Sequence, residues 1–426
     1  MKLKTKRNFF TDGLTMSNAI LSDIIFMCET RMKKTYFTRI GNNKMTFKSI
    51  VVFMLNFVKK SLQLELDDFF NGINNSNLSV TKQAFSDARQ KISHTAFVKL
   101  SDGIIKWFYE DTDFKTFKGY RLLSIDGTIL EISNTENLRD EFGYIENQSM
   151  KLARARAAGL YDVENDMIIT AVLSKYRANE RLQAEELINK LEEIGFSNDL
   201  ILFDRGYPSK DLISFIEQKE LKYLMRVSVS FKSLVNVKGE DQIVEIKNKK
   251  ETLKVRVLKF PLDSGVTEIL ITNVFDETFS VADFKELYFK RWGIEVKYNE
   301  LKNRLQIENF TGETTIAIKQ DFYATVYLSN MVTLAKMDAD IMISEKNKGK
   351  NLKYEYKVNT NILIGKLKNS LVSMLLEENP RKQSKLFKKT MKEISNNIIP
   401  IRPGRSNARR MTLRANKNSP NKKRAL

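Results

Sequence analysis

Two aspartates stand where carboxylates could work together in catalysis. Asp126 follows the apolar run LLSI and precedes Gly127, and Asp204 follows ILF and precedes Arg205 and Gly206. Each is therefore expected at or near the end of a β-strand, where a rigid sheet fixes the position of the carboxylate. A single aspartate after a strand more often caps a turn. Two in one region, each with a glycine within two residues, favour a shared site.

The segment 280–305 supplies a third carboxylate, Glu295, on a predicted helix. Four polar residues recur there at offsets of 0, 3, 7 and 14, namely Tyr288, Arg291, Glu295 and Lys302. At 100° per residue their side chains fall within about 60° of one another, beside a separate stripe of leucine and isoleucine. The alternative is a salt-bridged helix surface in which Arg291 and Glu295 form an ordinary pair one turn apart.

The ligand types restrict the metal that such carboxylates could hold. The chain has one cysteine, Cys28, and one histidine, His94. An intramolecular disulfide and a Cys/His zinc site are therefore excluded. Any metal must sit on oxygen ligands, which favours Mg²⁺ or Mn²⁺.

The overall charge indicates a polyanionic partner. Lys and Arg number 71 against 52 Asp and Glu, a formal charge of +19. Nucleic acid is the first expectation and an anionic membrane surface the second, because both attract a basic protein. No stretch reaches the roughly 18–20 apolar residues of a spanning helix. The N-terminal segment lacks the apolar core of a signal peptide, so we expect a cytoplasmic protein.

The organisation along the chain predicts four parts. Residues 1–115 show helical patterning, 116–318 alternate strands and helices, and 319–399 are again helical. Residues 400–426 are basic and contain no acidic residue, which is typical of a solvated tail. Within the third part, the apolar segment 322–334 is a candidate for contact between subunits.

The first part contains a candidate DNA-binding motif. Helical patterns at 62–70 and 79–92 flank an Asn/Gly-rich turn, which fits a helix-turn-helix. Lys82 and Arg89 are then available for DNA phosphates. A plain helical bundle with a solvated basic face remains the alternative.

The second part has the element order of a mixed α/β fold. A strand at 120–132 is followed by a hairpin at 153–174, a helix at 180–194, a strand at 200–203, a helix at 209–218 and a strand at 222–227. This order resembles the ribonuclease H-like fold, a mixed sheet flanked by helices. Alternating apolar and polar residues at 228–276 predict a β-rich insertion before the helix of Glu295.

The polar residues of that helix also match a family signature. The spacing Tyr288-x2-Arg291-x3-Glu295-x6-Lys302 resembles the signature of the insertion-sequence-four family of DDE transposases. The segments DGT at Asp126 and DRGY at Asp204 resemble the first and second acidic motifs of that family, in the same order. The recognisable similarity covers about residues 75–310.

The resemblance implies a reaction and its residues. Asp126, Asp204 and Glu295 would coordinate two divalent ions, Mg²⁺ or Mn²⁺, that activate the nucleophile and stabilise the leaving oxygen. Tyr288, Arg291 and Lys302 would contact phosphates at the transposon end. The implied activity is cleavage of transposon ends and strand transfer into target DNA. The implied partners are double-stranded DNA, as terminal inverted repeats and target, and a second subunit in a homodimer, at the nucleoid of a bacterial cell.

One expected family feature is missing from the sequence. Some relatives use a tryptophan of the β-rich insertion to hold a flipped base during hairpin formation. The tryptophans here, Trp107 and Trp292, lie outside the insertion. Phe231 or Phe260 could substitute, and Trp292 is interpreted as core packing.

Two other functions remain open at this point. A ribonuclease H-like nuclease would share the three acids without needing the tyrosine, arginine and lysine at this spacing. A DNA-binding relic would occupy transposon ends without cutting. A further basic segment at Arg177, Glu180 and Arg181 is interpreted as a solvated first turn of a helix.

Overall fold

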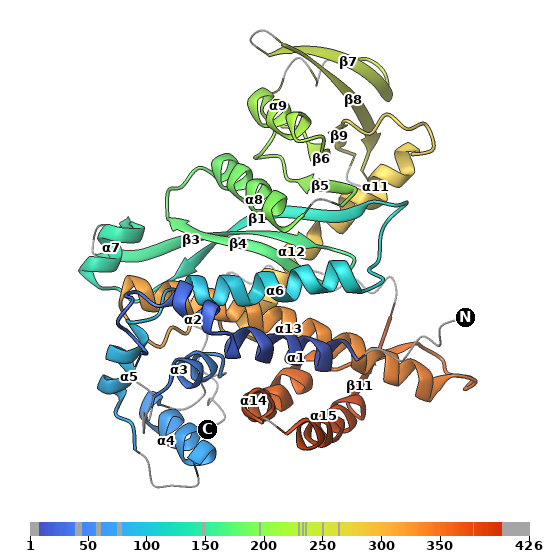
Figure 1. The fold of residues 1–426 in the computed structure, drawn as a ribbon. Helices are drawn as coiled ribbons and strands as arrows, with labels where there is room; N and C mark the ends of the chain where they lie inside the picture. The colour runs from blue at the N-terminus through green and yellow to red at the C-terminus, as the bar shows by residue number, and fades with distance from the viewer. Residues whose placement is uncertain are drawn as a thin grey trace. The chain divides into compact units, whose positions relative to one another are not determined.

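The computed structural model describes residues 8–38, 45–56, 61–74, 79–146, 148, 150–195, 197–228, 231, 234, 237–248, 251–262, 265–377 and 379–402. The chain forms two compact units (Figure 1). Unit 1 comprises Met1–Asn18, Arg31–Lys91 and Leu334–Leu426, and unit 2 comprises Ala19–Thr30 and Ile92–Thr333. These units do not follow the predicted boundaries at 115, 318 and 399, because unit 1 combines segments from both ends of the chain. Most of the predicted basic tail, from residue 403, lies outside the described residues.

Unit 1 is built mainly of helices. Those that belong to it wholly or in part are α1 (Phe9–Ser22), α3 (Phe47–Met54), α4 (Leu62–Asn74), α5 (Lys82–Arg89), α13 (Thr315–Asn347), α14 (Thr360–Leu376) and α15 (Pro380–Ser395). Strands β10 (Tyr356–Val358) and β11 (Ile398–Pro400) form a small antiparallel pair. Asp338 of α13 fixes the start of α1 by accepting the backbone N–H groups of Phe9 and Phe10. The turn predicted at 71–77 begins too early, because α4 continues to Asn74, and residues 75–78 lie outside the described residues.

Unit 2 is organised around one mixed sheet. Its described strands are β1 (Arg121–Glu131), β2 (Tyr144–Glu146), β3 (Lys151–Asp162), β4 (Met167–Lys175), β5 (Asp199–Phe203), β6 (Lys222–Arg226), β7 (Asp241–Asn248), β8 (Glu251–Pro261) and β9 (Thr267–Thr272). The order is β2-β3-β1-β5-β6-β9-β8-β7, with β4 paired to β3. β5 and β6 continue parallel to β1, whereas β3 is antiparallel to it. The predicted insertion is present as β7, β8 and β9, and it extends this sheet rather than forming a separate one.

Helices cover both faces of the sheet. They are α2 (Ile24–Thr30), α6 (Thr95–Asp111), α7 (Glu136–Phe142), α8 (Glu180–Ile194), α9 (Lys210–Gln218), α11 (Val281–Lys290), α12 (Trp292–Asn303) and the first part of α13. α8 packs on β1, β3 and β4, and α12 packs on β1 from the opposite face (Figure 1). The core on the α11 side joins Leu122, Leu202 and Leu224 of the sheet to Phe284 and Leu287 of α11.

The predicted single helix at 280–305 is wrong in one respect. Ser280 and Asp283 form a capping box that begins α11 as their spacing indicates. The helix then stops at Lys290 and resumes at Trp292. At the junction the N–H of Arg291 bonds to the carbonyl of Tyr288, three residues back, at 3.1 Å. Close packing accompanies this change of path, because a Cβ on Gly293 would lie 3.0 Å from Val163 Cγ1 of the β3–β4 turn.

The apolar segment 322–334 is also placed differently from the prediction. Phe322, Tyr327, Met331 and Leu334 are buried within the chain, so they do not form an exposed face for a second subunit. Among the described residues, no helix is long and apolar enough to cross a membrane.

Candidate functional site

The register of β1 and β5 brings the two predicted aspartates side by side. Ile125 lies beside Phe203 in the parallel pair, so extending the register by one residue places Asp126 beside Asp204. Neighbouring strands are about 5 Å apart, and laterally paired residues point to the same face. That face is the one covered by α11, because Leu122 and Leu202 of the same alternation pack there. The two carboxylates therefore lie side by side on that face of the sheet. Asp204 directly follows β5 as predicted, whereas Asp126 lies in the middle of β1 and not near its end, because β1 continues to Glu131 along β3.

Arg291, at the junction of α11 and α12, connects Glu295, the third predicted acid, to the two aspartates. Its Nη2 lies 3.0 Å from Glu295 Oε1, and its Nη1 lies 3.8 Å from Asp126 Oδ2. One turn earlier, the Tyr288 hydroxyl donates to Asp204 Oδ1 at 3.2 Å. The structure thus brings together Asp126, Asp204, Glu295, Tyr288 and Arg291.

Burial and mutual charge set the electrostatics of the site. Burial raises the pKa of the Asp126 carboxyl to about 6, and the negative charges of Asp204 and Glu295 add to the rise. The Gly127 N–H and the Arg291 guanidinium oppose it. Burial by itself lowers the pKa of Arg291, but Tyr288, Asp204 and Glu295 more than compensate and raise it. The site therefore holds a permanent cation between carboxylates, one of which is prone to protonation.

The Arg291 side chain also has unsatisfied hydrogen-bond donors among the described residues. It is 4% exposed, and its Nε and Nη1 are buried without a hydrogen-bond partner among the described residues. Unpaired buried donors are costly, since they have lost water without gaining an acceptor. Guanidinium donors in this state are suited to the oxygens of a phosphate, which accept paired hydrogen bonds.

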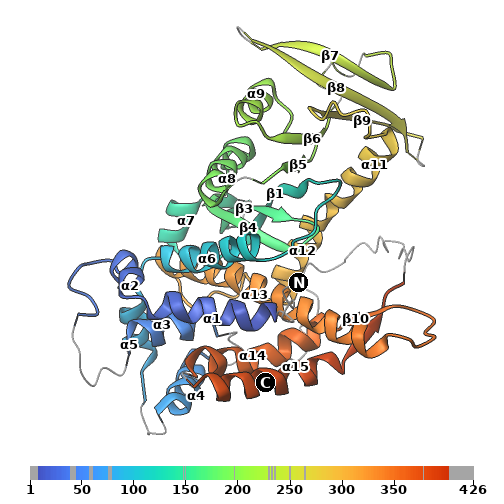
Figure 2. The ribbon, with the colours of Figure 1, turned by 45° about the vertical axis from the view of Figure 1, so that its right-hand side comes forward.

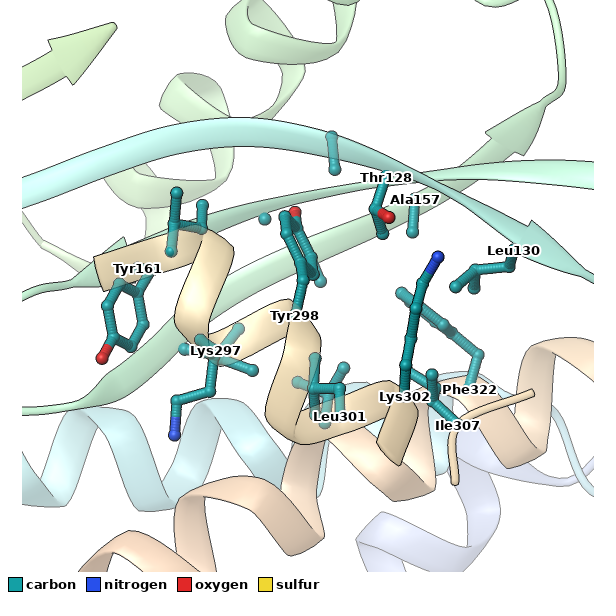
Figure 3. A pocket seen from close by; sticks show the side chains of 16 residues that line it. Thr128, Leu130, Ala157, Tyr161, Lys297, Tyr298, Leu301, Lys302, Ile307 and Phe322 are labelled. Carbon is teal, nitrogen blue, oxygen red and sulfur yellow. The ribbon is translucent and has the colours of Figure 1, made fainter. Parts of the chain in front are cut away.

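Tyr298 is a residue of the site that the sequence analysis did not identify. It projects from α12 toward the sheet (Figure 3), and its hydroxyl donates to the main-chain oxygen of Asp126 at 2.7 Å. Gly159 lies directly opposite Asp126 in β3, and a Cβ there would lie 3.2 Å from the Tyr298 hydroxyl. The helix of Glu295 is thus tied to the backbone of Asp126. An aromatic residue at helical spacing is otherwise typical of core packing, so the sequence held no signal for this contact.

Arg181 holds the loop that follows Asp204. Its Nε donates to the carbonyl of Tyr207 at 3.1 Å, and its Nη2 to those of Gly206 at 3.2 Å and Pro208 at 3.4 Å. Glu180 bonds to Arg156 of β3. The interpretation of this helix start as a merely solvated turn is therefore wrong for both residues.

Three predicted residues lie away from the carboxylates. Lys302 is two helical turns beyond Glu295, about 10 Å along the axis. Its side chain extends from α12 toward the sheet (Figure 3). Its Nζ donates to the carbonyl of Ile129 at 2.6 Å and lies 3.5 Å from Glu308 Oε1. Lys82 and Arg89 belong to unit 1. Lys82 is exposed, whereas Arg89 is 3% exposed with its guanidinium 5.6 Å from the centre of the Phe85 ring.

A cleft of about 560 Å³ lies beside Tyr288 and Arg291, between α11 and the strands β6, β8 and β9. Besides Tyr288, its aromatic lining consists of Phe260, Phe289 and Trp292. Phe289 is 75% exposed and Trp292 is 43% exposed, so the interpretation of Trp292 as core packing is wrong. The cleft also contains the cations Arg226 and Lys285 and the acids Glu268 and Glu286.

The donor atoms of the site fit a divalent metal by type. The carboxylates of Asp126, Asp204 and Glu295 are oxygen ligands of the kind that Mg²⁺ and Mn²⁺ prefer. In the part of the chain that is described, no three acidic, histidine or cysteine groups are close enough to enclose an ion. Glu295 is instead held by Arg291 at 3.0 Å.

Comparison with known proteins gives one family match, and it falls within unit 2. A family model described as a transposase DDE domain matches residues 117–331, about half of the chain. Transposase InsG of insertion sequence element IS4 from Escherichia coli (strain K12) is 21% identical over 272 residues. That alignment covers 59% of this chain and 60% of InsG, less than two thirds of its length.

A solved transposase structure aligns with most of the chain. The cryo-EM structure of the piggyBac transposase synaptic complex with hairpin DNA has a TM-score of 0.46 and 13% sequence identity to this chain. The match covers 94% of this chain and 85% of the piggyBac chain.

Proposed function

The chain belongs to the transposase DDE domain family, and on that premise we propose that it cuts the DNA ends of a transposable element and joins them to target DNA. One observation carries the proposal. Asp126, within β1, and Asp204, directly after β5, lie side by side where the parallel pairing of these strands ends, and Arg291 links Glu295 to them. Fixed carboxylates with an adjacent cation suit displacement at a phosphodiester, where anionic oxygens must be held close to acids.

Asp126, Asp204 and Glu295 would hold divalent ions, Mg²⁺ or Mn²⁺. When bound, these ions supply a nucleophile of lowered pKa and stabilise the leaving oxygen. The carboxylates must be ionised to act as ligands, and the raised pKa of Asp126, about 6, makes this residue the one whose protonation limits binding. Tyr288 holds Asp204 through its hydroxyl, and Tyr298 holds the backbone of Asp126.

Cations of the same unit would position the DNA. Arg291 would donate hydrogen bonds from Nε and Nη1 to a phosphate. These two atoms lack a partner among the described residues, and the phosphate would supply one. Lys302, farther along α12, would contact the next part of the backbone as a point charge. In unit 1, exposed Lys82 of α5 would serve a helix-turn-helix contact. The burial of Arg89 favours a packing role, and we retain only Lys82 for that contact.

The aromatic cleft suits a nucleotide that has left the duplex. Phe260, Phe289 and Trp292 offer stacking surfaces, and Arg226 and Lys285 offer charge for the backbone. Phe260 belongs to β8 of the insertion, so it would take the part that the sequence analysis assigned to either Phe231 or Phe260. A cut end with a displaced base is consistent with a hairpin intermediate.

Further parts of the proposal follow from the reaction. The arrangement of β1, the β3–β4 hairpin, β5 and β6 supports a ribonuclease H-like catalytic fold. Two ends must be cut and joined together, so a homodimer would bridge the two terminal inverted repeats. We place this reaction on the bacterial nucleoid in the cytoplasm.

The test is cleavage of a labelled duplex that carries the terminal repeat of the element. Wild type, Glu295→Gln and the control Glu313→Gln, an exposed carboxylate of the same unit, are compared with Mg²⁺ and with Mn²⁺. We expect wild type and Glu313→Gln to cut at the repeat boundary, and Glu295→Gln to bind the duplex without cutting. Thermal unfolding with and without Mg²⁺ gives a second readout, because an ion bound only by the folded chain raises its Tm.

Each other outcome selects a different function. Cutting at unrelated sequences without strand transfer would identify a ribonuclease H-like nuclease. Binding without cutting by all three proteins, in either metal, would identify a DNA-binding relic. If Glu295→Gln cuts as well as wild type, Glu295 is not a metal ligand and the proposal fails.

A further inference from the structure

Helix α15 carries a one-sided array of cations that the proposed site does not use. Six basic residues are exposed on its 16-residue length, namely Arg381, Lys382, Lys385, Lys388, Lys389 and Lys392. At 100° per residue they fall within an arc of about 120°. The buried residues of the helix centre on the opposite side, and they are Phe387, Thr390, Met391, Ile394 and Ser395. The cations therefore form one continuous outer surface, here called the α15 basic face.

The opposite side of α15 is already occupied by its own unit. Phe387 stacks on Phe10 of α1 with ring centroids 5.9 Å apart, and α15 packs along α14 (Figure 2). Glu393, the one acidic residue of the helix, is bound to Lys366 of α14 at 2.7 Å. Among the described residues, none of the six cations has an ion-pair partner. The face therefore keeps most of its positive charge, although Glu393 acts electrostatically on Lys389 as well as on Lys366.

This arrangement destabilises the helix in the absence of an anion. Arg381 and Lys385, Lys385 and Lys389, and Lys388 and Lys392 are spaced one turn apart, where like charges repel. Arg381 and Lys382 also occupy the first turn, where the helix dipole favours acids. A polyanion laid along the helix would relieve both effects.

We propose that the α15 basic face is a docking surface for the phosphate backbone of double-stranded DNA, without preference for sequence. The choice of DNA rests on the proposed function, and the geometry supports it independently. From Arg381 to Lys392 the face extends about 16 Å, along which a duplex presents phosphates at short intervals. The cations are nearly all lysines, whose ammonium groups are point charges on flexible stems and can each follow a phosphate. A membrane surface fits less well, because the apolar side of α15 is buried against its own unit and cannot insert.

The test removes four of the six charges in the full-length chain. Lys385, Lys388, Lys389 and Lys392 are changed to Gln, which keeps a strong helix former at each position. The matched control changes four exposed lysines of unit 2 to Gln, namely Lys175, Lys210, Lys247 and Lys254. Binding of two labelled duplexes, one with the terminal repeat and one of scrambled sequence, is measured by fluorescence anisotropy from 50 to 300 mM NaCl.

We expect the α15 variant to lose affinity for both duplexes about equally, by at least roughly tenfold at 150 mM salt. The magnitude of the slope of log K against log salt should fall by about 3.6 if each of the four lysines contacts one phosphate, since each lost phosphate contact removes about 0.9. The Tm without DNA should stay equal or rise, because repulsion within the helix is relieved. Cleavage at low salt, where DNA is saturating, should continue.

Several results would overturn the inference. They are a slope that changes by less than about one, an equal loss in the control variant, or a loss confined to the terminal repeat. A loss of binding to anionic vesicles with DNA binding intact would instead identify a membrane surface. Failure of wild type to cut DNA would refute the proposed function, while these binding measurements would still decide the role of α15.

Discussion

The contact between Tyr298 and Gly159 supports a double-substitution experiment whose result can be worked out in advance. Gly159→Ala places a Cβ 3.2 Å from the Tyr298 hydroxyl and 4.0 Å from its Cζ. The hydroxyl cannot retreat freely, because it is buried and bonded to the Asp126 carbonyl at 2.7 Å. Overpacking of this kind costs about 1–3 kcal/mol. Alanine also lowers the conformational entropy of the unfolded chain, which stabilises the folded state by about 0.4–1 kcal/mol. We expect a net loss of about 1–2 kcal/mol.

Tyr298→Phe should remove the obstruction. Alone it costs about 1–2 kcal/mol, because the carbonyl of Asp126 loses a hydrogen bond inside the protein. In that background the nearest ring atom is Cζ at 4.0 Å from the new Cβ, an ordinary contact. Gly159→Ala should then be neutral or slightly stabilising. The double variant should be more stable than additivity predicts by about 1–2 kcal/mol.

Urea unfolding followed by tryptophan fluorescence measures these differences. Both tryptophans of the chain, Trp107 and Trp292, belong to unit 2, so the signal reports on the unit that contains the contact. The midpoints are compared at constant m-value. Additive effects, to within about 0.5 kcal/mol, would refute the close approach of the hydroxyl to Gly159. In cleavage assays Tyr298→Phe should raise the Mg²⁺ concentration for half-maximal activity and leave sequence preference unchanged.

Three further predictions concern charge and positioning. Because the pKa of Asp126 is about 6 in the fold and lower when unfolded, the fold binds more protons between about pH 4 and 6. Unit 2 of wild type should therefore lose stability as pH rises through that window. Asp126→Asn should make this part of the stability curve less steep, while the buried carboxyls of Asp102 and Asp162, whose pKa is also raised to about 6, keep their contributions. Arg181→Met should lower kcat about tenfold with little change in KM, because the loop that follows Asp204 loses the side chain that binds the carbonyls of residues 206–208. The control Arg177→Met, at an exposed residue, should leave both constants unchanged. Lys297→Met should lower the free energy of unfolding by about 2–3 kcal/mol in the urea assay. The reason is that Asp166 and Glu300, whose carboxylates lie 2.6 and 3.2 Å from Lys297 Nζ, would face each other without a cation. A loss below about 1 kcal/mol would show that water already screens the two carboxylates.

The local structure of this protein could be predicted from the sequence because short-range rules control it. The β-rich composition of residues 120–132 and the hairpin pattern of residues 153–174 predicted β1 and the β3–β4 hairpin. Gly195 ends α8 and Ser280 begins α11, as their types indicate. The resemblance in the acidic motifs and in the Tyr288–Lys302 spacing identified the family, since that match depends only on residue types and intervals. The three acids could thus be named as candidates before any fold was known.

Tertiary structure decided how those residues meet. Asp126 and Asp204 are neighbours only because β1 and β5 pair in parallel in one register, which no local pattern determines. The break at Arg291 arises where α12 packs closely on the β3–β4 turn, and helical periodicity carries no trace of that contact. Tyr298, Arg181 and Arg89 looked like ordinary aromatic and basic residues. Their roles depend on which backbone or ring lies opposite, and long-range packing alone fixes that.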